Sequence, residues 1–206
     1  MNTDRKGIIL IVSAPSGAGK TSLCKEIIDI FPGLGHSVSY TTRPMRSGEA
    51  EGKDYHFVSP GTFQRMIEEG AFAEWAEVHG NRYGTALRTL ERFREEGKDI
   101  LLDIDCQGAE QLRRNDPDGV HVFVLPPSIE ELLRRLKGRE TDSSDVIEQR
   151  IANARGEMSR AGEYDYIIIN DDFDRAVEEL KAIFIAERCR TERRLPLARA
   201  IAGKRK

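Results

Sequence analysis

The sequence predicts an α/β protein in which a parallel sheet is flanked by helices. Short apolar runs alternate with helical stretches along most of the 206 residues, which is typical of chains that build parallel sheets. The segment 37–84 breaks this rhythm with short alternating strands and is interpreted as an inserted β-rich unit. With 39% hydrophobic and 33% charged residues, the chain suits one compact domain with inserted subdomains.

The core strands are expected at apolar runs, because β-branched runs of this length are typical of strands covered on both faces. These runs lie at 7–13, 99–105, 121–125 and 166–170. Helices are expected at 20–30, 85–96, 107–114 and 128–137, after the polar stretch 138–145 to about 160, and at 174–190. Ser128 and Glu131 have the spacing of a capping box, which predicts the start of one of them.

The inserted unit is expected to contain strands at 37–42, 55–58 and 72–78. A polar, glycine-containing loop separates the first two strands, and a helix is expected at 60–69. Such a unit within an otherwise regular α/β chain indicates a place where a ligand binds.

Composition excludes several classes of protein. The longest apolar run, Ile8–Val12, is far short of the ~20 residues that cross a bilayer, and no signal-peptide core precedes it. The three cysteines are widely spaced, which argues against a disulfide framework or a zinc ribbon. A net charge of −3 provides no general attraction for nucleic acid. We therefore expect a cytoplasmic protein with no membrane or nucleic-acid partner, and leave monomer or homo-oligomer undecided.

A glycine-rich turn joins the first expected strand to the first helix, with the sequence S-A-P-S-G-A-G-K-T over 13–21. It fits the P-loop pattern G-x-x-x-x-G-K-[ST], except that Ala14 replaces the leading glycine. The backbone N–H groups of such a turn surround a phosphate chain, Lys20 would neutralise the β- and γ-phosphates, and the Thr21 hydroxyl would bind Mg²⁺. The predicted ATP contacts here are Ala14, Pro15, Ser16, Gly17, Ala18, Gly19, Lys20, Thr21 and Ser22. The alternative is a glycine-rich turn with a surface lysine.

A second anion site is indicated by Arg43 and Arg46, which stand three residues apart around Pro44, with Tyr55 a few residues on. Guanidinium groups match phosphate oxygens in pairs, and a tyrosine hydroxyl adds a neutral donor. The alternative for this segment alone is a solvated polar loop.

The motifs T-T-R-P-x-R-x-G-E-x-x-G-x-D-Y-x-F, E-W-A-x-V-x-G-x-x-Y-G-T and L-D-I-D-x-Q-G follow in this order behind the P-loop. Together they closely resemble the guanylate kinase family over roughly residues 7–180. Bacterial-type members commonly carry alanine at the position of Ala14. The resemblance implies a P-loop NTPase-type sheet with an inserted GMP-binding subdomain and a helical lid, and transfer of the γ-phosphoryl group of ATP to GMP, and to dGMP, with Mg²⁺.

The resemblance also implies which residues hold GMP. The phosphate contacts fall on Arg43, Arg46, Tyr55 and Tyr83, and the guanine contacts on Ser39, Glu74, Thr85 and Asp103. The chemistry of Glu74 fits independently, since guanine presents two adjacent N–H donors that one carboxylate accepts as a pair, and adenine does not. The alternatives are a surface strand glutamate for Glu74 and a helix N-cap for Thr85.

Asp103 and Asp105 end a buried strand, where either could support Mg²⁺ through water beside Thr21. The alternative for Asp105 is a cap for the following helix. Arg135, Arg139 and Arg150 match arginines that the family brings over the ATP phosphates when its lid closes, whereas Arg134 and Arg155 are expected on a solvated face. With Lys20 and Arg43, Arg139 and Arg150 form the predicted catalytic set. Asn170 matches a position near the adenine, or is a turn residue.

These assignments divide the chain into a core with the P-loop (1–36), a GMP-binding subdomain (37–85), core (86–137), a lid (138–153), and core with a basic tail (154–206). The tail is expected as a frayed helix end with solvated residues. Two other functions remain open. One is a non-catalytic binding module of guanylate-kinase-like type, and the other is a kinase for another nucleoside monophosphate.

Overall fold

The computed structural model describes residues 6–78, 80–116, 118–138 and 144–203. Its centre is a parallel sheet of five strands in the order β2-β7-β1-β8-β9. The strands are β1 (Ile9–Ser13), β2 (Leu34–His36), β7 (Asp99–Asp103), β8 (Val120–Leu125) and β9 (Tyr166–Ile169). The predicted α/β fold class is confirmed, and the central strand β1 is the one that leads into the glycine-rich turn.

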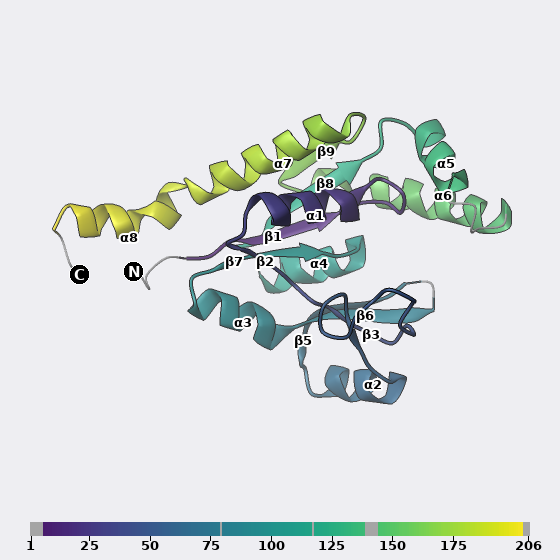
Figure 1. Cartoon of the computed structure of the whole chain (residues 1–206), viewed down its shortest axis with the longest axis horizontal. Helices are drawn as coiled ribbons and strands as arrows, with labels where there is room; N and C mark the ends of the chain where they lie inside the picture. Colours follow the sequence, from purple (N-terminus) through teal and green to yellow (C-terminus); the bar gives the residue numbers. More distant parts are fainter. Residues whose placement is uncertain (1–5, 79, 117, 139–143, 204–206) are drawn as a thin grey trace.

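Helices cover both faces of this sheet, as Figure 1 shows. On one face lie α1 (Lys20–Ile30) and α7 (Phe173–Arg188), packed on Leu10 and Val12 of β1. On the other lie α3 (Leu87–Glu95) and α4 (Cys106–Asn115), packed on Ile9 and Ile11. Alternate residues of β1 therefore serve opposite faces, as the two-residue period of a strand requires.

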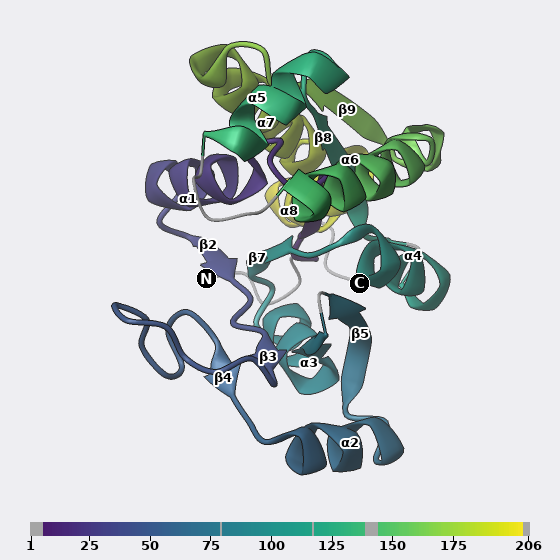
Figure 2. The same ribbon diagram turned by 90° about the vertical axis from the view of Figure 1, so that its right-hand side faces the viewer.

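A second sheet of four strands forms the inserted unit, in the order β4-β3-β6-β5. Its strands are β3 (Tyr40–Thr41), β4 (His56–Phe57), β5 (Phe72–Val78) and β6 (Asn81–Ala86), and α2 (Pro60–Glu68) covers it. Phe63 of α2 is fully buried and stacks on Phe72, with ring centroids 4.5 Å apart. Figure 2 shows this unit beneath the parallel sheet.

The sequence did not predict strand β6. Thr85 and Ala86 end β6, and α3 begins only at Leu87 with Ala86 as its N-cap, so the N-cap interpretation of Thr85 is wrong. The strand found in the segment 37–42 is shorter than predicted. It is β3 and covers only Tyr40–Thr41, and the preceding strand β2 ends at His36. Pairing with β5 explains β6, which lies antiparallel to it from Asn81 to Ala86.

Two helices, α5 (Ile129–Lys137) and α6 (Ser144–Met158), flank the predicted lid loop. Ser128 caps α5 by accepting the Glu131 N–H at 3.1 Å, as its capping-box spacing predicts. Leu132 and Leu136 of α5 are buried together with Ala154 of α6. The predicted arginine Arg139 lies outside the described residues.

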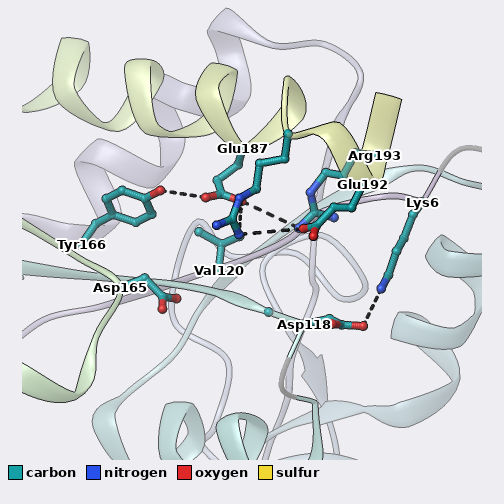
Figure 3. A pocket seen from close by; sticks show the side chains of 10 residues that line it. Lys6, Asp118, Val120, Asp165, Tyr166, Glu187, Glu192 and Arg193 are labelled. Atoms are coloured by element: carbon teal, nitrogen blue, oxygen red, sulfur yellow. Dashed lines mark hydrogen bonds and ion pairs between the residues drawn. The ribbon is translucent and has the colours of Figure 1, made fainter. Parts of the chain in front are cut away.

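The C-terminal segment is a helix, α8 (Thr191–Ile201), rather than a frayed end. Arg193 is 7% exposed and donates to the Gly7 carbonyl at 3.1 Å, which ties α8 to the start of β1. Glu187 lies beside it and accepts the Tyr166 hydroxyl at 2.7 Å (Figure 3). These groups line a polar cavity of about 440 Å³ at the amino ends of the strands. No helix in the described part of the chain is long and apolar enough to cross a membrane.

His121 is predicted to make the fold sensitive to acid. It is 3% exposed, both ring nitrogens lack hydrogen-bond partners among the described residues, and burial lowers its pKa to about 4. The unfolded chain therefore binds a proton between pH 4 and 6.5 that the folded chain does not, and stability falls as the pH drops through this range. Replacing His121 by Leu is expected to remove roughly 1–3 kcal/mol of this loss. Urea unfolding at pH 7 and pH 5 measures it, and an equal pH dependence in both proteins would contradict the prediction.

Candidate active site

One cleft of about 900 Å³ collects most of the predicted site residues at the carboxyl ends of the parallel strands. It is bounded by the glycine-rich turn, the inserted sheet and helix α6. Its lining includes Ala14, Pro15, Ser16, Gly17, Gly19, Lys20, Thr21, Ser22, Ser39, Tyr55, Glu74, Tyr83, Asp103, Asp105 and Arg150. Segments up to 146 residues apart in sequence, from Ala14 to Arg160, therefore face the same space.

The glycine-rich turn adopts a backbone conformation with positive φ angles, which glycine favours. Gly19 has φ +97°, and a Cβ there would stand 2.3 Å from the Asn170 side-chain nitrogen. That nitrogen donates to the Ala18 carbonyl at 2.7 Å, so Asn170 braces the turn from the end of β9. Ala18 is itself fully buried and is absent from the cleft lining.

Lys20 begins α1 and is held against the end of β7. Its ammonium lies 2.7 Å from an Asp103 carboxylate oxygen and donates to the Ile104 carbonyl at 2.6 Å. Burial disfavours the charged ammonium, but the Asp103 carboxylate outweighs this effect, and the pKa of Lys20 is raised above its usual value. The lysine of the turn is therefore a fixed cation in the cleft and not a surface lysine.

Asp105 caps α4, because its carboxylate accepts the Gly108 N–H at 2.9 Å. The capping alternative for Asp105 is thus confirmed, and its side chain still lines the cleft. Asp103 lies on the same strand end but pairs with Lys20, which places it between the glycine-rich turn and the inserted sheet.

Glu74 is the most buried carboxylate of the cleft, at 3% exposed. A β-bulge between Phe72 and Glu74 aims it inward, and it pairs in register with Thr85 of β6. Burial raises the pKa of Glu74 to about 7, and the Asp105 charge adds to the rise. The buried Thr85 side chain and its backbone act against this rise. The interpretation of Glu74 as a surface glutamate is wrong.

The two predicted phosphate arginines lie apart from the cleft lining. Arg43 is half-buried and holds Glu49 through two hydrogen bonds of 3.1 and 2.7 Å, with its guanidinium 5.4 Å from the Tyr55 ring centroid. The Tyr55 and Tyr83 rings meet edge to face at 5.8 Å. Arg46 is exposed, and its backbone N–H donates to Glu49. The Glu49 carboxylate is thus the anionic partner of Arg43 in this structure. The sequence analysis did not predict this partner.

The described lid arginines differ in their surroundings. Arg135 donates to Glu131 at 2.7 Å and to the Asn170 carbonyl at 2.9 Å, so it lies beside the residue that braces the turn. Arg150 of α6 lines the cleft directly. Arg134 has a 75% exposed side chain and pairs with Glu131, as expected for a solvated face.

Sequence reasoning missed several cleft residues that α6 and the segment after it contribute. Glu157 lies near Asp105, and burial raises its pKa. Arg160 lines the cleft and pairs with Glu110 of α4 at 2.7 Å. Both follow the polar lid stretch on an expected helix, but no motif in the sequence indicates that they face the cleft.

The fold and the glycine-rich turn define a P-loop protein whose cleft is also lined by the inserted sheet. A model of the guanylate kinase family matches residues 6–187, and the chain belongs to this family. It is 62% identical to the guanylate kinase of Syntrophotalea carbinolica over 92% of this chain and 90% of that one. It is 63% identical to that of Geobacter metallireducens over 92% and 93%. A crystal structure of guanylate kinase from Anaplasma phagocytophilum matches with a TM-score of 0.79 and 33% identity, covering 99% of each chain.

Replacing Glu74 by Gln is expected to stabilise the free protein at alkaline pH. Because the pKa of Glu74 is raised from 4.5 to about 7, its ionisation lowers stability progressively as the pH rises through this range. The glutamine variant escapes this loss and should gain roughly 1–3 kcal/mol relative to wild type between pH 5 and pH 8. Urea unfolding at both pH values tests it, and a stability difference that is the same at pH 5 and pH 8 would contradict it.

Proposed function

We propose that this protein transfers the γ-phosphoryl group of ATP to GMP, and to dGMP, giving ADP and GDP or dGDP. The observation that carries the proposal is the shared cleft, which is lined by both the fixed Lys20 ammonium and the buried Glu74 carboxylate. The first suits a triphosphate and the second suits a guanine base. On this proposal, the cleft would hold a donor and an acceptor nucleotide end to end.

On the donor side, the backbone N–H groups of residues 14–19 and the amino end of α1 would hold the phosphate chain of ATP. Lys20 would move from Asp103 to the β- and γ-phosphates when they arrive. The half-buried Arg135, beside Asn170, is close to the turn and is proposed to reach the donor nucleotide with Arg139.

On the acceptor side, Glu74 would accept both N–H donors of guanine, and Thr85, Ser39 and Asp103 would complete the base site. Thr85 supports this role because its buried side chain lies beside the Glu74 carboxylate and acts against the rise in the pKa of Glu74. Tyr55, Tyr83, Arg43 and Arg46 would bind the GMP phosphate. Since Glu49 now occupies Arg43, the incoming phosphate would replace a carboxylate, which keeps the arginine extended and charged in the free protein.

Mg²⁺ would join through the ATP phosphates. No group of three metal-ligating side chains exists in the part of the chain that the structure describes, which fits an ion that keeps most of its water. Thr21 on the cleft wall would supply one oxygen, and Asp103 or Asp105 would act through water. The ion would neutralise charge on the transferred phosphoryl group.

No catalytic base is required, because the GMP phosphate is already an anion at neutral pH. Rate enhancement then comes from alignment and from charge neutralisation by Lys20, Arg43, Arg139 and Arg150. Closure of the proposed lid over the cleft would keep water from competing as acceptor. On the same grounds we propose a division into a GMP-binding subdomain (37–85), a lid (138–153) and the surrounding core segments. We also propose a cytoplasmic location, where cysteines stay reduced.

The two alternatives are less well supported. A binding module without catalysis has no need for a lysine buried against a carboxylate in a glycine-rich turn. A kinase for AMP or a pyrimidine nucleotide would leave the buried Glu74 carboxylate without a pair of donors, at a high cost.

Replacing Lys20 by Met is expected to lower kcat roughly 10²–10³-fold, because one preorganised charge on the transferred group is lost. The assay couples ADP release to oxidation of a reduced nicotinamide, with GMP, dGMP, AMP, UMP and dTMP as acceptors. Lys25→Met is the matched control, since Lys25 is exposed one turn further along α1. If the wild-type protein phosphorylates none of these acceptors, the binding module is favoured. If it phosphorylates AMP faster than GMP, a kinase for another nucleotide is favoured.

The value of kcat/KM for GMP is expected to fall as the pH drops below about 7, because this ratio reports groups of the free enzyme and the pKa of Glu74 is about 7. The protonated carboxyl accepts guanine N–H groups poorly. Glu74→Gln is the control, because any remaining pH dependence then comes from the GMP phosphate itself. Identical profiles for the two proteins would remove Glu74 from the base site.

A further inference from the structure

Helix α4 carries a face of small and amide side chains along the outer edge of strand β5. Gly108, Gln111 and Asn115 follow one another at spacings of three and four residues, so they share one face of the helix. β5 is the last strand of its sheet, and its outer peptide groups have no neighbouring strand. A helix face with amide side chains can satisfy such groups where a strand is missing.

Gln111 and Asn115 do so at two alternate residues of β5. The Trp75 N–H donates to the Gln111 side-chain oxygen at 3.2 Å, and the Gln111 amide nitrogen donates to the Trp75 carbonyl at 2.6 Å. The Asn115 side chain donates to the Ala73 carbonyl at 3.4 Å. These bonds hold the backbone on both sides of Glu74.

Gly108 provides the room that the Glu74 carboxylate occupies. A Cβ at this position would stand 2.3 Å from one carboxylate oxygen of Glu74 and 3.0 Å from its carboxyl carbon. The backbone of Gly108 is helical and its φ is not in the left-handed region, so the conformation itself does not call for glycine. Alanine would be the better helix former here, so the glycine is explained by the carboxylate beside it.

We propose that this face of α4 is a specificity-determining support of the acceptor site. Gly108 leaves the space, and Gln111 with Asn115 fixes the register of β5, so that the Glu74 carboxylate stays in the cleft to meet a purine with two adjacent N–H donors. Gln111 and Asn115 are positioning residues, since they touch β5 and not the nucleotide. The inference rests on the proposed recognition of GMP by Glu74.

The first test is Gly108→Ala. The added methyl group should expel the Glu74 carboxylate from its position while leaving α4 at least as stable. KM for GMP is expected to rise at least tenfold, with KM for ATP and kcat at saturating GMP within twofold of wild type. Gly61→Ala is the matched control, because Gly61 also lies in a helix and its added Cβ would meet nothing closer than 4.0 Å.

A second pair of variants addresses Gln111. Gln111→Ala removes both bonds to Trp75 and should raise KM for GMP with KM for ATP unchanged, whereas Gln111→Glu keeps the acceptor for the Trp75 N–H and should recover part of the loss. Preference for GMP over IMP, which lacks the exocyclic amine, should shrink in the same order. Gln64→Ala is the control, since Gln64 lies on α2 and its hydrogen bonds among the described residues go to the Glu68 and Arg82 side chains and not to the backbone of β5.

The outcomes separate the two levels of the proposal. If wild type phosphorylates GMP and Glu74→Gln loses that activity, but Gly108→Ala and Gln111→Ala keep KM for GMP within twofold, the support role is overturned and the proposed function stands. If wild type does not phosphorylate GMP, the proposed function fails first. Equal rises of KM for GMP and for ATP in the α4 variants would mark a general structural defect and would also overturn the inference.

Discussion

The carboxylate of Glu74 is the constraint on which the acceptor side of this cleft depends. It is almost fully buried and forms no ion pair with any residue that the structure describes. Burial is the main cause that raises its pKa to about 7; the Asp105 charge adds to the rise and Thr85 opposes it. A carboxyl in this state is costly to ionise. In the proposed function a ligand would supply two N–H donors to this carboxylate, and its unfavourable burial would then make the site selective.

The arrangement of the proposed donor side depends on the strand order of the sheet rather than on the burial of a charged group. β1 lies between β7 and β8, so the turn after β1 emerges beside the end of β7, where Asp103 and Asp105 lie. Lys20 reaches Asp103 across that gap, and the helix dipole of α1 and the turn amides add further positive potential. A carboxylate next to this lysine keeps it charged and oriented until a stronger anion arrives. Sheet order alone brings these groups together.

How much the sequence could predict depended on whether the signal was local. Helix α1 begins and ends as predicted at Lys20 and Ile30, because a glycine-rich turn precedes it and a proline follows it. Strand β6 was missed, since N-R-Y-G-T-A shows little apolar alternation and becomes a strand through pairing with β5. Helix α8 was underestimated for a similar reason, since Arg193 is buried only through groups of α7 and the start of β1.

The site itself shows the same division. Lys20 was found from the local P-loop pattern, and Glu74 was assigned from the family resemblance, which also implied that both residues serve one site. The Glu49 partner of Arg43 and the cleft positions of Glu157 and Arg160 depend on how loops and helices fold back, which spacing does not encode. Ion pairs between separate segments of the chain cannot be predicted from sequence spacing and become visible only in the three-dimensional structure.

Helix α4 contacts both parts of the cleft, near Lys20 and near Glu74. Its amino end is capped by Asp105, next to the strand end where Lys20 is anchored, and its first turn faces Glu74 through Gly108. Further along, Gln111 and Asn115 fasten β5, and Glu110 pairs with Arg160 beyond α6. A displacement of α4 would therefore disturb the strand end beside Lys20, the surroundings of Glu74 and the contact with Arg160 together. If two nucleotides bind as proposed, both would depend on the position of this one helix, which is a stronger constraint than either binding region would impose alone.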